Sequence, residues 1–159
     1  MADMNKPLLE VKNLKTFFKT RNGIVKAVND VSYSIYPGKT LGIVGESGSG
    51  KSVSAMSVLR LLDANGYIAG GTVTFDGQDL SKVTTEQMYH IRGNRISVIF
   101  QEPMTSLDPV MKIGPQVEES LRIHTKKTPQ ERKAAALAAM AEAEAQQTSG
   151  EDYSGDWGE

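Results

Sequence analysis

The sequence predicts an α/β domain, and three observations indicate this class. The segment TLGIV, residues 40–44, is apolar without alternation, which is typical of a central strand covered on both faces. The segment 51–62, KSVSAMSVLRLL, carries its apolar residues at helical spacing. Short runs rich in β-branched and aromatic residues lie before and after this pair, and we expect them to form further strands.

The chain before residue 40 predicts antiparallel strands. Residues 8–12 and 31–36 are short runs of Val, Leu, Ile and Tyr, bounded by Asn, Pro and Gly. The segment 17–28 between them contains Arg-Asn-Gly, a turn signal, so we expect a hairpin here. The run VSYSIY alternates, which predicts a sheet with one solvated face.

The chain after residue 62 predicts further strands and helices. In order, we expect a loop at 63–71, a strand at 72–75, a helix from Thr84 to about Arg92, a strand at 95–100, a loop at 101–109 and a helix at 112–124. The spacing from Thr84 to Gln87 is that of a capping box. Thr128, Pro129 and Glu131 then predict the start of an Ala-rich helix.

Composition excludes several classes of protein. The chain has 159 residues, 39% of them hydrophobic, and a net charge of −1, which predicts one soluble globular domain. This charge argues against a nucleic-acid binder that relies on bulk positive charge. Without cysteines there is no disulfide framework and no Cys-based zinc site. The N-terminus does not resemble a secretory signal, and the longest apolar run, 134–141, is too short to span a bilayer.

Residues 45–52, GESGSGKS, match the P-loop pattern G-x-x-x-x-G-K-[ST]. Glycines allow successive backbone N–H groups to converge on a phosphate, and the following helix adds its positive end. We expect Lys51 to reach the β- and γ-phosphates and the Ser52 hydroxyl to bind Mg²⁺. The alternative is a plain Gly-Ser turn between a strand and a helix. The residues expected to bind the nucleotide here are Gly45, Ser47, Gly48, Ser49, Gly50, Lys51, Ser52 and Val53.

The string VGESGSGKS, with AVNDVSYSI before it and VIFQEPMTSLDP after it, resembles the ATP-binding subunits of ABC transporters. Within that family it is most similar to the oligopeptide and dipeptide importer group, and QEPMTSLDP is the most group-specific string. The resemblance runs from about Leu8 to about Ala139. It implies a P-loop NTPase fold, an ABC-type nucleotide-binding domain with an antiparallel β subdomain, and ATP and Mg²⁺ as cofactors.

The resemblance also implies roles for single residues. Phe18 aligns with the aromatic residue that stacks on adenine, although Phe17 is a rival and a hairpin-core Phe is the alternative. Gln101 aligns with the Q-loop glutamine, a catalytic position that touches Mg²⁺ or the attacking water and senses the permease; the alternative is a surface glutamine. The loop 102–109 and the following helix would face the permease. Glu102 is not assigned as the catalytic carboxylate, because Gln101 stands where a Walker B motif has Asp.

The family also has parts that we do not find in this sequence: the signature motif, the Walker B Asp-Glu pair and the switch histidine. We therefore interpret the chain as truncated before these motifs. The expected organisation is the N-terminal part of the ATP-binding domain at 1–126, an Ala-rich helix at 127–146 that begins the helical subdomain, and an acidic disordered tail at 147–159.

The expected function is that of an ATP-binding subunit that couples ATP binding and hydrolysis to solute transport, with turnover by this chain itself in doubt. The implied partners are permease subunits, a second ATP-binding subunit in a dimer and, indirectly, an extracytoplasmic solute-binding protein, with no nucleic acid. The implied location is peripheral, on the cytoplasmic face of the plasma membrane. One alternative is a non-catalytic remnant that binds only nucleotide or permease. Another P-loop enzyme, such as a kinase, is disfavoured because no acceptor-site Asp or Arg cluster is present.

Overall fold

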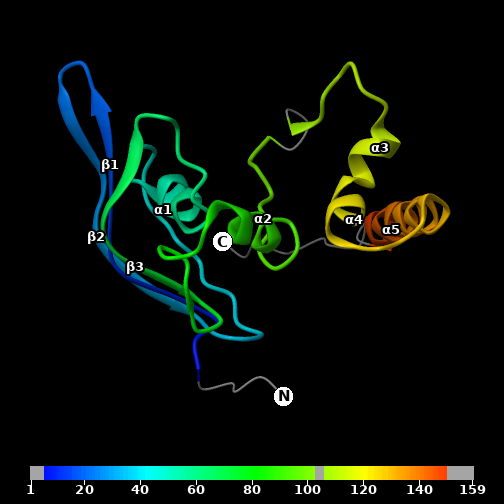
Figure 1. The fold of residues 1–159 in the computed structure, drawn as a ribbon, viewed down its shortest axis with the longest axis horizontal. Coiled ribbons are helices and arrows are strands. Elements are labelled where there is room, and N and C mark those ends of the chain that lie inside the picture. The colour runs from blue at the N-terminus through cyan, green and yellow to red at the C-terminus, as the bar shows by residue number, and fades with distance from the viewer. Residues whose placement is uncertain (1–5, 103–105, 150–159) are drawn as a thin grey trace, which may run out of the picture. The chain divides into compact units, whose positions relative to one another are not determined.

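The computed structural model describes residues 6–102 and 106–149 of the chain (Figure 1). The chain divides into two compact units, the first ending at Arg92 and the second beginning at Gly93. Each unit is described by itself. Among the helices of the described residues, none is both long enough and apolar enough to cross a membrane.

The first unit is built on an antiparallel sheet with the strand order β2-β1-β3-β4. Its strands are β1 (Leu9–Thr20), β2 (Gly23–Ile35), β3 (Gly66–Phe75) and β4 (Gln78–Asp79). The predicted hairpin is confirmed, since β1 and β2 pair from Leu9 with Ile35 to Thr20 with Gly23. The loop predicted at 63–71 is wrong from Gly66 onward, because the backbone there pairs with Phe18 and extends β3.

One face of this sheet carries α1 (Lys51–Val58), which packs on β1 and β2. The helix ends four residues before the predicted position 62, and Leu59 is its C-cap. The buried hydroxyls of Thr16 on β1 and Ser57 on α1 lie 2.8 Å apart. The apolar core of this unit consists of Val11, Leu14, Val28, Val58, Leu59, Val73, Phe75, Leu80, Val83, Met88 and Ile91.

The helix α2 (Thr85–Ile91) begins at the predicted capping box. The backbone N–H of Gln87 donates to the Thr84 hydroxyl at 3.2 Å, and the Thr84 N–H donates to the Gln87 side-chain oxygen at 2.8 Å. These two bonds satisfy backbone donors that a helix start leaves without partners. The helix contributes the buried side chains of Met88 and Ile91 to the core.

The strands predicted at 40–44 and 95–100 are wrong. Neither segment belongs to a strand, and Ile96 forms only an isolated bridge. Val44 is 96% exposed and Ile99 is 91% exposed. An apolar run becomes a strand only when another strand offers its backbone hydrogen bonds, and no described residue does so for 40–44.

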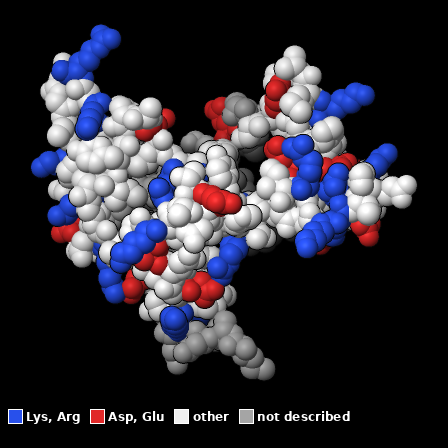
Figure 2. Space-filling view, in the orientation of Figure 1, with Lys and Arg blue, Asp and Glu red and all other residues white. Residues whose placement is uncertain are grey.

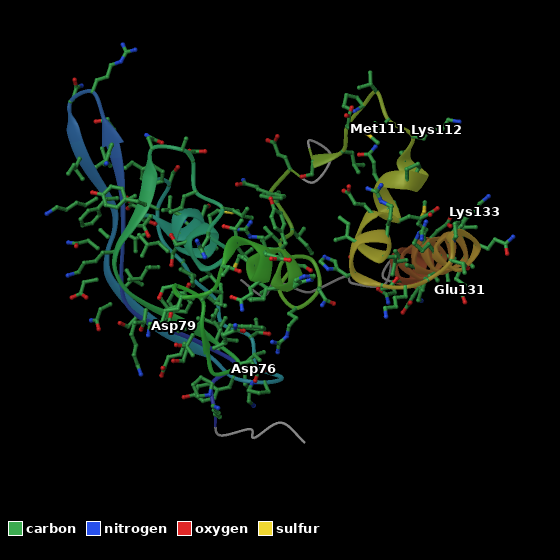
Figure 3. All side chains as sticks on the ribbon, in the orientation of Figure 1. Asp76, Asp79, Met111, Lys112, Glu131 and Lys133 are labelled. Carbon is green, nitrogen blue, oxygen red and sulfur yellow. The ribbon has the colours of Figure 1, made fainter. Side chains whose placement is uncertain are left out.

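The second unit is helical, with α3 (Ile113–Val117), α4 (Glu119–His124) and α5 (Pro129–Ser149). The helix predicted at 112–124 is divided in two at Glu118, which is both the C-cap of α3 and the N-cap of α4. The start of α5 is as predicted: the Glu131 carboxylate accepts from the Thr128 N–H at 2.7 Å (Figure 3). The helix α5 continues to Ser149, so the tail predicted to begin at 147 is helical to that residue, and 150–159 lie outside the described residues. The domain boundary at 126 stays a prediction.

Candidate functional site

The P-loop forms a tight turn between the segment 40–44, which has no regular secondary structure, and the start of α1. Gly48 and Gly50 have φ values of +78° and +90°, the left-handed region that favours glycine. The Ser49 N–H donates to the Glu46 carbonyl at 3.2 Å, which closes the turn. The loop therefore has the curled backbone that the motif predicts.

Gly50 fixes this loop against the sheet. A Cβ atom at Gly50 would lie 2.4 Å from the carbonyl oxygen of Ala27 on β2, so only glycine fits there. Gly50 is also the N-cap of α1 and leaves the cap position without a side-chain hydrogen bond. Because the first N–H groups of a helix have no acceptor within it, the start of α1 offers donors to an anion. The contact with Ala27 has no signal in the sequence, since the two residues are 23 positions apart (50 − 27).

Lys51 lies across the loop that precedes it. Its ammonium group donates to the carbonyl oxygens of Gly45 and Glu46 at 2.6 and 2.7 Å, and it lies 3.4 Å from the Ser49 hydroxyl. These bonds hold a full positive charge beside the glycine-rich backbone. A fixed cation, together with converging N–H groups, is the donor set that a polyphosphate requires.

A cavity of about 380 Å³ lies beside the loop, between it and β2. Next to it, the Ser52 side chain is exposed in the first turn of α1, whereas Ser54 is buried and lies 3.3 Å from the Tyr33 hydroxyl. Ser52 is thus accessible for a metal ion, as its predicted role requires. The cavity is lined by Lys26, Ala27, Val28, Asn29, Val31, Ile43, Val44, Gly45, Ser49, Gly50, Lys51 and Ser54.

Phe18 and Phe17 point to opposite faces of the sheet. Phe18 lines a cavity of about 160 Å³ together with Ser52 and Val53 at the start of α1. The Phe17 ring instead makes an edge-to-face contact with the Tyr67 ring, with centroids 6.2 Å apart. The structure therefore brings Phe18, and not its rival, to the P-loop helix. Stacking of adenine on Phe18 stays a prediction.

Gln101 belongs to the second unit and is exposed, so its approach to the nucleotide stays a prediction.

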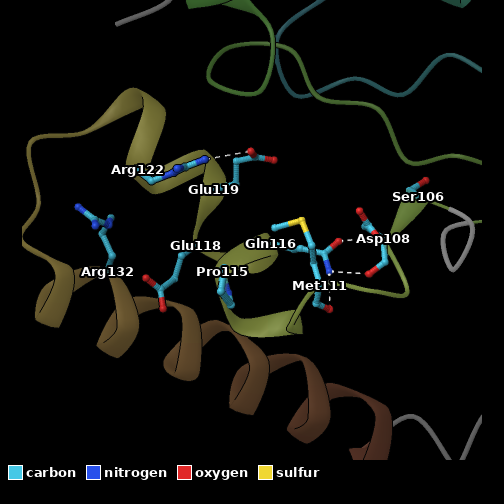
Figure 4. A pocket seen from close by; sticks show the side chains of 9 residues that line it. All are labelled: Ser106, Asp108, Met111, Pro115, Gln116, Glu118, Glu119, Arg122 and Arg132. Carbon is cyan, nitrogen blue, oxygen red and sulfur yellow. Dashed lines mark hydrogen bonds and ion pairs between the residues drawn. The ribbon is translucent and has the colours of Figure 1, made fainter.

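The second unit contains a cavity of about 460 Å³ (Figure 4). Gln116, which the sequence analysis did not single out, organises its rim: its amide accepts from the Asp108 N–H at 2.8 Å and donates to the Asp108 carbonyl at 3.0 Å. Residues 103–105 of the loop predicted to face the permease lie outside the described residues.

Among the described residues, three charged groups have shifted pKa values, and all three lie outside the P-loop. A hydrogen bond from the Ser81 hydroxyl lowers the pKa of Asp79, and the backbone hydrogen bond from Thr128 lowers the pKa of Glu131. Burial lowers the pKa of Arg92, whose guanidinium donates to the Leu59 carbonyl at 2.8 Å. Within the described residues, no three His, Cys, Asp or Glu side chains gather into a cluster that could hold a metal ion.

A comparison with models of protein families identifies the family of this chain. A model of the ABC transporter family matches residues 28–156. The chain belongs to the ABC transporter family. This family match extends past Ala139, where the expected resemblance to the peptide importer group ends.

Individual relatives refine this assignment. The chain is 50% identical over 118 residues to a putative peptide import ATP-binding protein of Brucella melitensis, and 52% identical over 118 residues to the oligopeptide transport ATP-binding protein OppD of Haemophilus influenzae. OppD of Escherichia coli is 50% identical over 117 residues. Each match covers 74% of this chain but only 34% to 36% of the relative, so the chain spans about a third of their length. The predicted resemblance to the peptide importer group is confirmed.

Solved structures support the fold. A dimeric ATP-binding cassette, MJ0796, in a post-hydrolysis state bound to ADP and Pi, matches with a TM-score of 0.74 and 26% identity. The match covers 86% of this chain and 57% of that chain. The predicted fold class, an ABC-type nucleotide-binding domain with an antiparallel β subdomain, is confirmed.

Proposed function

We propose that this chain is part of the ATP-binding subunit of a peptide-type ABC transporter, and that it binds Mg-ATP at residues 45–53. The observation that supports this proposal is the geometry of the P-loop. Gly50 packs on β2, and the Lys51 ammonium group lies 2.6 to 2.7 Å from two carbonyl oxygens of the loop. The peptide class rests on the names of the relatives from Brucella melitensis and Haemophilus influenzae.

The residues of the loop fit a bound nucleotide. The N–H groups at the start of α1 would donate to phosphate oxygens, and Lys51 would exchange its carbonyl partners for the outer phosphates. The exposed Ser52 hydroxyl would hold Mg²⁺, and the Phe18 ring would cover the adenine. When bound, Mg-ATP supplies the phosphoryl group for hydrolysis, and we assign catalytic positions to Lys51 and Gln101 in that reaction.

The second unit carries the proposed coupling to the membrane partner. Val110 and Ile113 are exposed beside the cavity at 106–132, where a permease segment could bury them. A second ATP-binding subunit would complete a dimer, and a solute-binding protein would act through the permease. The subunit would then lie peripherally on the cytoplasmic face of the plasma membrane. The dimeric cassette among the solved structures supports the dimer.

A second candidate is a chain that binds nucleotide or permease without hydrolysing ATP. The exposed segment 40–44 favours it, because the backbone that enters the P-loop pairs with no strand of the described residues. Phosphoryl transfer depends on donors that are held in place before the reaction. A loop that packs on β2 through Gly50 but is entered by an unpaired segment can bind phosphate and is less well positioned for catalysis.

Thermal unfolding with and without Mg-ATP tests nucleotide binding. At a ligand concentration of 100 Kd, binding stabilises the folded chain by about 2.7 kcal/mol. We expect this shift for the native chain and for Lys39→Ala, a matched control whose side chain is exposed outside the cavity. We expect Lys51→Ala to abolish it. No shift in the native chain would refute nucleotide binding.

Phosphate release separates the two candidates. If release occurs and Lys51→Ala removes it, the chain hydrolyses ATP. If Mg-ATP raises the unfolding temperature but no phosphate is released, the non-catalytic candidate is correct.

A further inference from the structure

Positive charge gathers at the free end of the β1–β2 hairpin. It comes from four residues that we call the hairpin cations: Lys15, Lys19, Arg21 and Lys26. The Phe17 and Tyr67 rings are in contact, and the Lys19 and Lys26 ammonium groups lie over these two rings, so Phe17, Lys19 and Lys26 share one face of the sheet. Figure 2 shows Lys and Arg side chains over this end of the hairpin, at the upper left.

No acidic side chain within the described part of the chain pairs with these cations. Residues 15–28 contain no Asp or Glu, and none of the hairpin cations forms an ion pair with a carboxylate of the described residues. Two of the ammonium groups lie over aromatic rings instead: Lys19 is 5.5 Å from the Tyr67 centroid and Lys26 is 5.8 Å from the Phe17 centroid. Since the whole chain has a net charge of −1, the positive field is local to the hairpin.

The tip of the same hairpin exposes apolar side chains. Ile24 and Val25 are 58% and 52% exposed, and they lie between Arg21 and Lys26 in the chain. A single exposed apolar residue is ordinary on a protein surface. In the hairpin register Ile24 lies opposite Lys19 and Val25 opposite Phe18, so the two side chains project from opposite faces at the tip. A tip that enters the bilayer interface end-on would present both, and exposed aliphatic residues flanked by cations have the composition of segments that rest in the interface of an anionic membrane.

We propose that this end of the hairpin binds the surface of an anionic lipid bilayer. The hairpin cations would contact the headgroups, while Ile24 and Val25 would reach the boundary of the acyl chains. A single-stranded nucleic acid would need free aromatic faces for base stacking. Here lysine ammonium groups lie over the Phe17 and Tyr67 rings, and the most exposed apolar side chains are aliphatic, so the surface fits lipid better. The proposal does not depend on nucleotide binding.

Vesicle flotation with the full chain tests this proposal, without permease and without nucleotide. We compare vesicles of phosphatidylcholine alone with vesicles that also contain phosphatidylglycerol. We expect binding only to the anionic vesicles, weakened by added salt because the contacts are largely electrostatic. Lys19→Gln with Lys26→Gln should lower the partition coefficient by at least ~10-fold, at about fivefold per cation.

Two further double substitutions test whether binding depends on the hairpin in particular. Lys112→Gln with Lys133→Gln removes the same charge from exposed positions elsewhere (Figure 3) and should change the partition coefficient less than about twofold. Ile24→Ser with Val25→Ser should weaken binding while its salt dependence remains. Equal losses in both lysine pairs, equal binding to neutral vesicles, or no binding to anionic vesicles would overturn the proposal. So would displacement by a single-stranded oligonucleotide at lower concentration than by anionic vesicles.

Discussion

The contact between Gly50 and β2 leads to a sharp comparison of two glycine substitutions. At Gly48, φ is +78° and nothing lies within 4 Å of an added Cβ, so Gly48→Ala has only the cost of the left-handed backbone, about 1 kcal/mol. At Gly50, φ is +90° and the added Cβ would also meet the Ala27 carbonyl oxygen at 2.4 Å. That overlap forces the loop or β2 to move, which adds about 2 kcal/mol.

Thermal unfolding followed by circular dichroism measures this difference. One kcal/mol lowers the Tm of a domain of 60–100 residues, the size of the unit that ends at Arg92, by about 4–8 °C. We therefore expect that unit to lose about 4–8 °C with Gly48→Ala and about 12–24 °C with Gly50→Ala. Each variant adds one methyl group to the native chain, and both positions have a left-handed φ. Equal losses in Tm would show that the loop does not pack on β2 as described.

Three other predictions test the described contacts. Thr16→Val should cost about 1 kcal/mol in urea unfolding, and combining it with Ser57→Ala should cost less than the sum, because the two buried hydroxyls lie 2.8 Å apart. Thr84→Ala should cost about 1 kcal/mol in the same assay through loss of the capping box at α2, whereas Thr85→Ala, outside the box, should cost less than half as much. The pKa of the Glu131 carboxyl is lower in the folded chain than its ordinary value of 4.5, so the ionised carboxylate stabilises the start of α5 at pH values above 4.5. This stabilisation is lost as the pH falls through the lowered pKa. Glu131→Gln should therefore reduce the acid-dependent loss of helical ellipticity; an unchanged pH profile would contradict the role of that carboxylate.

Local features of the chain were predictable because their requirements are local. The P-loop turn needs glycine where φ is positive, and Gly48 and Gly50 supply it within a recognisable pattern. The capping box at Thr84 and the start of α5 near Thr128 each depend on residues within one helical turn. The hairpin between β1 and β2 was likewise indicated by its Asn-Gly turn.

The candidate site was predictable in its residues but not in its arrangement. The motif identified Lys51 and Ser52, and the resemblance identified Phe18, but only the structure shows Phe18 and Ser52 lining one cavity while Phe17 faces away. The Ala27 carbonyl against Gly50 could not be predicted, because a backbone contact between distant segments leaves no residue-type signal. The same reasoning applies to Gln116, whose amide is anchored by loop carbonyls.

The family, the phosphate-binding loop and the helix starts follow from the amino-acid sequence, since each of these is specified by neighbouring residues. Which apolar runs form strands depends on contacts between distant parts of the chain. The segment 66–71 looked like a loop and became part of β3, because β1 offered it a partner. The segment 40–44 looked like a buried strand and stayed unpaired, because a strand forms only where a second backbone satisfies its hydrogen bonds.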